Sequence, residues 1–147
     1  MKKSRFKRNL FSICVGIGIS VLLFSLNVTP KKINNYSDFM SGILSVSSMT
    51  TGLLFASFAL IPALPNSRLL QNLKKLKTDK KLLDRLLVVI LGFLFCSVFA
   101  LIALSFKETD TSLFSKVIIS ITGGLFCFSL SEQIKVIWIL MKVVEKL

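Results

Sequence analysis

Histidine is absent from this chain of 147 residues, and only seven of its residues are Asp or Glu. Without histidine the chain lacks the commonest general base, the commonest metal ligand and the usual partner of a nucleophilic serine or cysteine. The three cysteines, Cys14, Cys96 and Cys127, stand far apart inside apolar stretches, without the spacing of a metal site. We therefore predict that they are small buried hydrophobic residues, that the protein needs no cofactor, and that it is not an enzyme.

Basic residues, in contrast, are abundant. There are 19 Lys and Arg residues and a formal net charge of +12, although 53% of the residues are hydrophobic. The two properties are separated along the chain, because basic runs alternate with four apolar stretches of about bilayer-spanning length. Such stretches form helices in lipid, since a helix satisfies its own backbone hydrogen bonds. The sequence predicts an all-α, polytopic membrane protein with four transmembrane helices, and it excludes a soluble globular enzyme.

These four spans belong to a single membrane domain, residues 1–147. The predicted spans are residues 10–28, 39–64, 86–104 and 113–131, with an alternative end of the last one at residue 141. A basic loop, 65–85, joins the second span to the third, and residues 132–147 form a tail. A signal peptide is the alternative for the first span. We favour a retained span, because the apolar run is longer than usual and no Ala-x-Ala cleavage site follows it.

The distribution of positive charge predicts the orientation. Five basic residues in the leader, seven in the middle loop and three in the C-terminal segment lie on one side of the predicted spans, against four in the two opposite loops. Segments rich in Lys and Arg remain in the cytoplasm. We therefore expect both termini to be cytoplasmic and the protein to lie in the bacterial inner membrane, with the lipid bilayer as its first partner.

Small residues recur at helical spacing in every predicted span. In lipid no hydrophobic force draws helices together, and small residues allow their axes to approach closely. In the second span Ser41, Ser45, Ser48, Gly52 and Ala56 occupy one helix face from end to end. The other spans carry Ser12, Gly16 and Ser20; Gly92, Cys96, Ala100 and Ala103; and Ser120, Gly124, Cys127 and Ser131.

Two functions fit these small faces. They could hold a four-helix bundle together, or, in the second span, they could line a weakly polar path or pack between subunits. Four short helices cannot enclose a shielded water-filled pore, so a conducting protein would have to be a homo-oligomer with one span from each subunit around the axis.

Glu132 is the one acidic residue that could lie within the membrane. If the fourth span ends at Leu130, then Glu132 lies at the cytoplasmic boundary, and an amphipathic extension anchored by Trp138 follows it. If the span continues to Met141, the carboxylate lies inside, where an ionisable group is costly and commonly functional. We prefer the first alternative because it buries fewer charges.

The middle loop also has two interpretations. Its basic residues could set the orientation by meeting anionic lipid headgroups. They could instead bind an anionic nucleotide or oligonucleotide, although no aromatic residue interleaves with them for base stacking. The candidate ligand-binding residues are Arg68, Lys74, Lys75, Lys77, Lys80, Lys81 and Arg85.

The stretch Ser41 to Arg85 combines a Ser/Gly/Thr-rich span, a Phe-Ala-Ser-Phe segment at 55–58, an end bounded by prolines, and a Leu/Lys-rich link. In this architecture the chain is similar to the four-span membrane effectors of anti-phage defence systems, such as the Hailong type, whose signal a partner nucleotidyltransferase makes. The resemblance implies an oligomeric channel that depolarises the membrane of an infected cell when it senses an anionic nucleic-acid-like messenger.

Two further functions compete with a channel. One is that of a bacteriocin immunity membrane protein, which a neighbouring bacteriocin gene would support. The other is a small transporter, which fits less well. Small multidrug exporters also have four spans, but they need a carboxylate in the first one, and residues 10–28 contain none.

Overall fold

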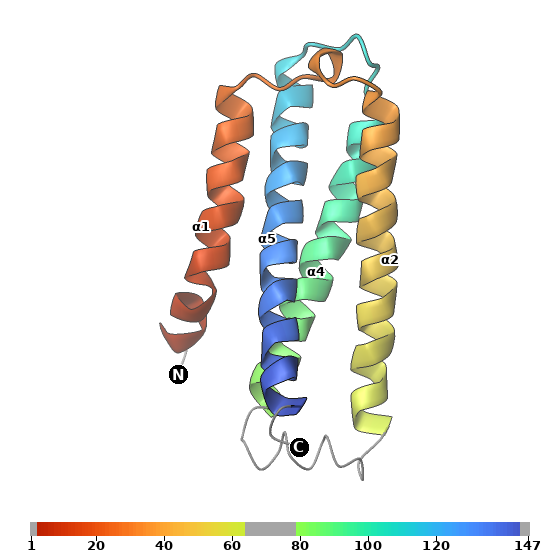
Figure 1. Cartoon of the computed structure of the whole chain (residues 1–147). Coiled ribbons are helices and arrows are strands. Elements are labelled where there is room, and N and C mark those ends of the chain that lie inside the picture. The colour runs from red at the N-terminus through yellow and green to blue at the C-terminus, as the bar shows by residue number, and fades with distance from the viewer. Residues whose placement is uncertain (1–2, 64–78, 145–147) are drawn as a thin grey trace.

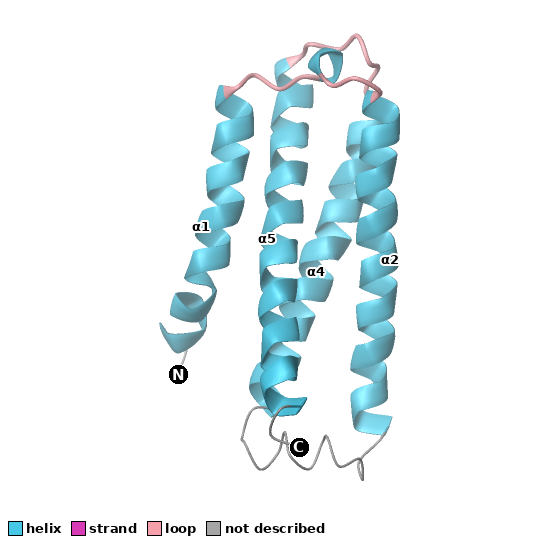
Figure 2. Ribbon diagram, viewed as in Figure 1, coloured by secondary structure: helices cyan, strands magenta, loops and turns pink. Residues whose placement is uncertain are grey.

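The computed structural model describes the backbone of residues 3–63 and 79–144 and the side chains of residues 10–59 and 82–141. In these ranges the chain is helical, as predicted, with loops only at one end of the molecule (Figure 2). The helices are α1 (Lys3–Ser25), α2 (Tyr36–Ala63), α4 (Asp79–Leu104) and α5 (Leu113–Val144), with a short 3-10 helix η1 (Pro30–Lys32) between the first two.

Three of the helices are long and apolar enough to cross a membrane. The candidate spans are Tyr36–Ala59 in α2, Leu82–Leu104 in α4 and Leu113–Met141 in α5. The apolar part of α1, Leu10–Ser25, is shorter. Its 16 residues rise by about 24 Å, against a hydrocarbon core of about 30 Å. By length and composition, the three long helices indicate a membrane protein.

Asn27 ends α1 three residues before the predicted end of the first span. Its φ is 50°, in the left-handed region, and the Val28 N–H donates to the Leu23 carbonyl oxygen at 3.3 Å. This bond reaches back across the last turn in the pattern of a Schellman motif, in which asparagine can replace glycine. The chain therefore leaves the helix at this point and crosses to α2.

Two other boundaries also differ from the predicted ones. The helix α2 begins at Tyr36, directly after Asn35, which is also left-handed with a φ of 52°. The helix α4 begins at Asp79, so residues 79–85 of the predicted loop form its first two turns. The aspartate lies at a helix N-terminus, where a negative charge is favourable.

The four helices pack side by side in the order α1, α5, α4, α2 (Figure 1). The inner helices, α5 and α4, each have two close neighbours, whereas α1 packs closely on α5 alone and α2 on α4 alone. The loops 26–35 and 105–112 lie at the same end of the molecule. The start of α1, the end of α2, the start of α4 and the end of α5 share the opposite end (Figure 1).

Small residues set the distances between α1, α5 and α4. A Cβ added at Gly124 of α5 would lie 2.7 Å from the Gly16 carbonyl oxygen of α1 and would collide with Ser20 Oγ. A Cβ at Gly92 of α4 would collide with Ser129 Oγ of α5. These contacts leave no room for side chains, so the helix backbones themselves approach closely.

Polar bonds connect α2 to α4 and α4 to α5. The buried Tyr36 hydroxyl of α2 donates to the Ala103 carbonyl oxygen of α4 at 2.7 Å. Deeper in the helices, Ser47 Oγ of α2 donates to Cys96 Sγ of α4 at 3.4 Å, and Cys96 Sγ lies 3.8 Å from the Thr122 carbonyl oxygen of α5. A chain of hydrogen bonds thus crosses three helices within the apolar core.

We predict that Gly124→Ala lowers the free energy of unfolding by about 1–3 kcal/mol, because the added methyl must push α1 away from α5. Thermal unfolding of the purified protein in detergent measures the change. Gly18→Ala, in α1, is the matched control, since a Cβ at that position meets nothing within 4 Å. Equal midpoints for the two variants would show that the α1–α5 approach is not as close as described.

Candidate functional site

Glu132 of α5 is the one charged residue with no exposed surface among the side chains of residues 10–59 and 82–141. It follows Leu113, the first residue of α5, by 19 positions, a helical rise of about 28 Å. That rise is close to the thickness of a hydrocarbon core, about 30 Å. Glu132 therefore lies toward one end of the apolar region. The neighbouring helices of the same chain nevertheless bury it completely.

The helix that carries Glu132 does not end near it. The helix α5 continues unbroken to Val144, and its candidate span reaches Met141. The helix therefore passes both predicted ends of the span, Leu130 and Met141, and Glu132 and Lys135 belong to the same continuous helix.

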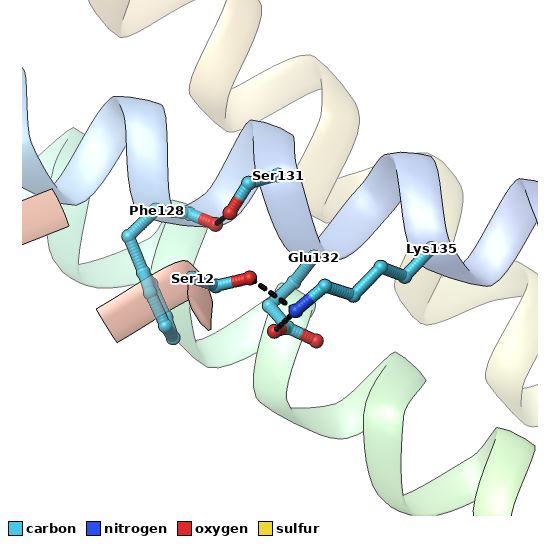
Figure 3. A network of polar contacts seen from close by, with 5 residues as sticks. All are labelled: Ser12, Phe128, Ser131, Glu132 and Lys135. Atoms are coloured by element: carbon cyan, nitrogen blue, oxygen red, sulfur yellow. Dashed lines mark hydrogen bonds and ion pairs between the residues drawn. The ribbon is translucent and has the colours of Figure 1, made fainter. Parts of the chain in front are cut away.

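Lys135 joins Glu132 to α1. Its Nζ donates to Glu132 Oε1 at 2.8 Å, and it also donates to Ser12 Oγ of α1 at 2.5 Å (Figure 3). The same nitrogen lies 5.5 Å from the centre of the Phe11 ring, a cation–π distance. Ser12 is fully buried, whereas the Lys135 side chain is 24% exposed. We call Ser12, Glu132 and Lys135 the polar clamp.

The clamp satisfies only one of the two carboxylate oxygens. Glu132 Oε2 is buried and has no hydrogen-bond partner among the residues that the structure describes. Buried polar atoms nearly always have a partner, and one without costs about 1–3 kcal/mol. The neighbouring Ser131 hydroxyl does not supply it, because it donates to the Phe128 carbonyl oxygen at 2.8 Å (Figure 3). The Glu132–Lys135 pair therefore carries no net charge, and Glu132 Oε2 can still accept a hydrogen bond.

The small face predicted for the second span lies on the outside of the molecule. All of its residues are exposed on α2. They are Ser41, Ser45, Ser48, Gly52 and Ala56. The helix turns its opposite side, with Tyr36, Met40 and Ser47, toward the core. No close packing within the described chain therefore uses this face, which we call the α2 small face.

Two of the three serines of the α2 small face bond to their own helix. Ser41 Oγ donates to the Asp38 carbonyl oxygen at 3.1 Å, and Ser48 Oγ donates to the Ser45 carbonyl oxygen at 3.2 Å. Their hydroxyl oxygens remain able to accept a hydrogen bond from outside the helix. The face is thus weakly polar, without charge, and has little steric bulk.

The small residues predicted for the other spans face inward. Gly16, Gly92 and Gly124 are buried at the helix contacts described above. Cys96 is also buried and Cys127 is partly buried, but the prediction of a buried Cys14 is wrong, because this thiol is exposed. The reason is that α1 packs on a single neighbour through Ser12 and Gly16, and a residue two positions from each of them points to the opposite side.

Most of the predicted ligand-binding set lies outside the described residues. This holds for Arg68, Lys74, Lys75 and Lys77, and for the side chains of Lys80 and Lys81 in the first turn of α4. Arg85 is described, partly exposed, in the second turn of α4. Among the described residues, no group of three or more Cys, Asp or Glu could hold a metal ion.

Comparison of the chain with protein-family models, with curated proteins and with solved structures returned no match.

We predict that Lys135→Met lowers the free energy of unfolding by about 3 kcal/mol, because it leaves the Glu132 carboxylate buried without a counter-charge. The double variant Glu132→Gln with Lys135→Met removes both charges and should recover most of that loss. Chemical unfolding in detergent provides the comparison. If the double variant is less stable than Lys135→Met, the ion pair is not what holds this region together.

Proposed function

We propose that the chain is the subunit of a homo-oligomeric membrane channel or pore, with α1, α2, α4 and α5 all crossing the bacterial inner membrane. Both termini would be cytoplasmic. The protein would act as an effector in anti-phage defence, opening in response to an anionic nucleotide or oligonucleotide made by a partner enzyme. The exposure of the α2 small face is the single observation that carries the channel part of this proposal.

The α2 small face needs a partner that the single chain does not supply. On α1, α4 and α5 the small faces are buried against neighbouring helices, so helix packing explains them. On α2 the exposed residues beside the small face are large, among them Met49, 70% exposed, and Phe55, 63% exposed. Large apolar side chains of this kind suit contact with lipid tails, whereas a stripe of Ser, Gly and Ala suits the close approach of another helix.

A ring of α2 helices, one from each subunit, would give this face a function. Its serine oxygens would accept hydrogen bonds from water or a hydrated ion, and its glycine and alanine positions would leave space at the axis. A narrow lumen of this kind, partly hydroxyl-lined and partly apolar, can stay closed by excluding water and conduct when it widens.

The orientation and the trigger rest on charge. The start of α1, the end of α2, the start of α4 and the end of α5 share one end of the molecule (Figure 1). The basic leader, the middle loop and the C-terminal segment are attached there, so the positive-inside rule assigns that end to the cytoplasm. The density of Lys and Arg in the middle loop, together with the resemblance to defence effectors, supports an anionic nucleotide signal.

We predict that cysteines on the α2 small face cross-link between subunits and control conduction. In a background with Cys14, Cys96 and Cys127 replaced by alanine, Ser45→Cys and Ser48→Cys should form disulfide dimers on oxidation. In separate experiments on the reduced protein, a charged thiol reagent should change the current across a planar bilayer. Leu53→Cys is the control, since Leu53 is exposed on a different side of α2. Equal cross-linking and equal current changes at all three positions would contradict the assignment.

We predict that neutralising the middle-loop lysines abolishes activation. The variant carries Lys74, Lys75, Lys77, Lys80 and Lys81 changed to Gln, and a potential-sensitive dye reports depolarisation in cells that also express a nucleotide-synthesising partner. Labelling of a terminal tag in intact and opened cells verifies that the variant keeps its orientation. A correctly oriented variant that depolarises cells as the unmodified chain does would overturn the ligand-binding assignment. Normal growth and potential with the unmodified chain would favour an immunity protein.

A further inference from the structure

We propose that the polar clamp is a releasable contact that holds α1 against α5, and that its opening lets the half of α1 nearer the N-terminus move away from the other helices. Only the link between this movement and conduction rests on the proposed function. The movement itself follows from how α1 is attached to the rest of the molecule.

Among the described helices, α1 is held by a single close neighbour. This helix packs closely on α5 alone. The contact is made at small residues, Gly16 and Ser20 against Gly124. Beside them a cavity of about 370 Å³ opens between the two helices, lined by apolar side chains that include Ile17, Val21 and Leu125. The cavity therefore leaves part of the interface between α1 and α5 unfilled.

Polar bonds fasten the two ends of this contact. Near the loop end, Lys116 Nζ of α5 donates to Asn27 Oδ1, just after α1, at 3.1 Å. At the other end, Lys135 Nζ donates to Ser12 Oγ. Asn27 belongs to a short, hydrogen-bonded connection, so that end is held by the chain as well as by the bond. Among the described side chains, the bond from Lys135 to Ser12 is the polar bond that holds the other end, and this is the end that we propose opens.

Opening the clamp does not require separation of its charges. Lys135 and Glu132 lie on the same helix, one turn apart, and their ion pair stays intact when α1 leaves. The ammonium has three N–H donors. The donor that Ser12 gives up can turn to Glu132 Oε2, which is buried and lacks a partner in the described part of the chain. One hydrogen bond replaces another, which offsets part of the free energy of release, while the cation–π contact with Phe11 favours the clamped arrangement.

Distance measurements between α1 and α5 test the clamp without any assumption about conduction. Spin labels are attached at Leu10→Cys on α1 and Ile137→Cys on α5, both exposed positions, in the full chain with its native cysteines changed to alanine. The labelled protein is reconstituted into lipid nanodiscs with an excess of unlabelled chain, so that only distances within one subunit are recorded by pulsed electron paramagnetic resonance.

The informative variant is Ser12→Ala, because it removes the bond between the helices and leaves the ion pair in place. We expect a second, longer distance whose population relative to the clamped one rises roughly tenfold, the effect of losing a charge-assisted hydrogen bond. Ser25→Ala is the matched control, since Ser25 is also on α1, is exposed, and donates only to its own helix at the Leu22 carbonyl oxygen, 2.9 Å away. Identical distance distributions for Ser12→Ala and Ser25→Ala would overturn the proposal.

Conduction by the same variants separates the clamp from the channel. In planar bilayers, Ser12→Ala should raise the basal current and Ser25→Ala should not. If the distance shifts while no variant conducts at all, the clamp stands and the proposed function fails. If the unmodified chain conducts and the distance shifts without any change in current, the clamp is real but its link to opening is overturned.

Discussion

Close approach of helix backbones at small residues is the constraint on which the rest of this structure depends. Lipid supplies no hydrophobic force that would draw helices together, so the helices meet where side chains are smallest. Gly16 meets Gly124, and Gly92 meets Ser129, and these two contacts place α1 and α4 on either side of α5. The order α1, α5, α4 follows from them, and α2 packs on α4 through Tyr36 and Ser47 with its small face exposed.

Polar atoms inside the row of helices are nearly all satisfied locally. Thr122 and Ser129, for example, donate to carbonyl oxygens of their own helix, each at 2.8 Å. Within the described side chains, only Ser120 Oγ and Glu132 Oε2 are buried without a partner. Leaving a buried serine hydroxyl without a partner costs less free energy than leaving one oxygen of a carboxylate without a partner. Glu132 is therefore the place where the polar atoms of the core are least satisfied, and its partner Lys135 bonds to α1, a helix with one close neighbour.

The helices and their faces were predictable from the sequence, because the spacing of small residues and the length of an apolar stretch are local properties. It placed Ser41, Ser45, Ser48, Gly52 and Ala56 on one face, and they do share one. It could not decide whether that face turns inward, since periodicity defines a face but not its neighbour. A buried Cys14 was expected because this residue stands inside an apolar stretch, and the structure leaves it exposed.

The ion pair of the polar clamp was predictable from the sequence, whereas its bond to Ser12 was not. The spacing of Glu132 and Lys135 is that of an ion pair on one helix turn, a signal that was present in the sequence. Ser12 is 123 positions away from Lys135, and nothing local connects them. The burial of Glu132 was not predictable from the sequence, because it depends on the packing of the helices and on the ion pair with Lys135, which itself bonds to a serine of another helix.

The central claim is that several copies of this chain assemble through α2 into a conducting pore. The most direct test combines native mass spectrometry of the purified protein in detergent with current recording from the same preparation in planar bilayers. The account predicts a complex of several chains and discrete steps of current. A protein that remains a single chain and leaves the bilayer insulating would contradict it.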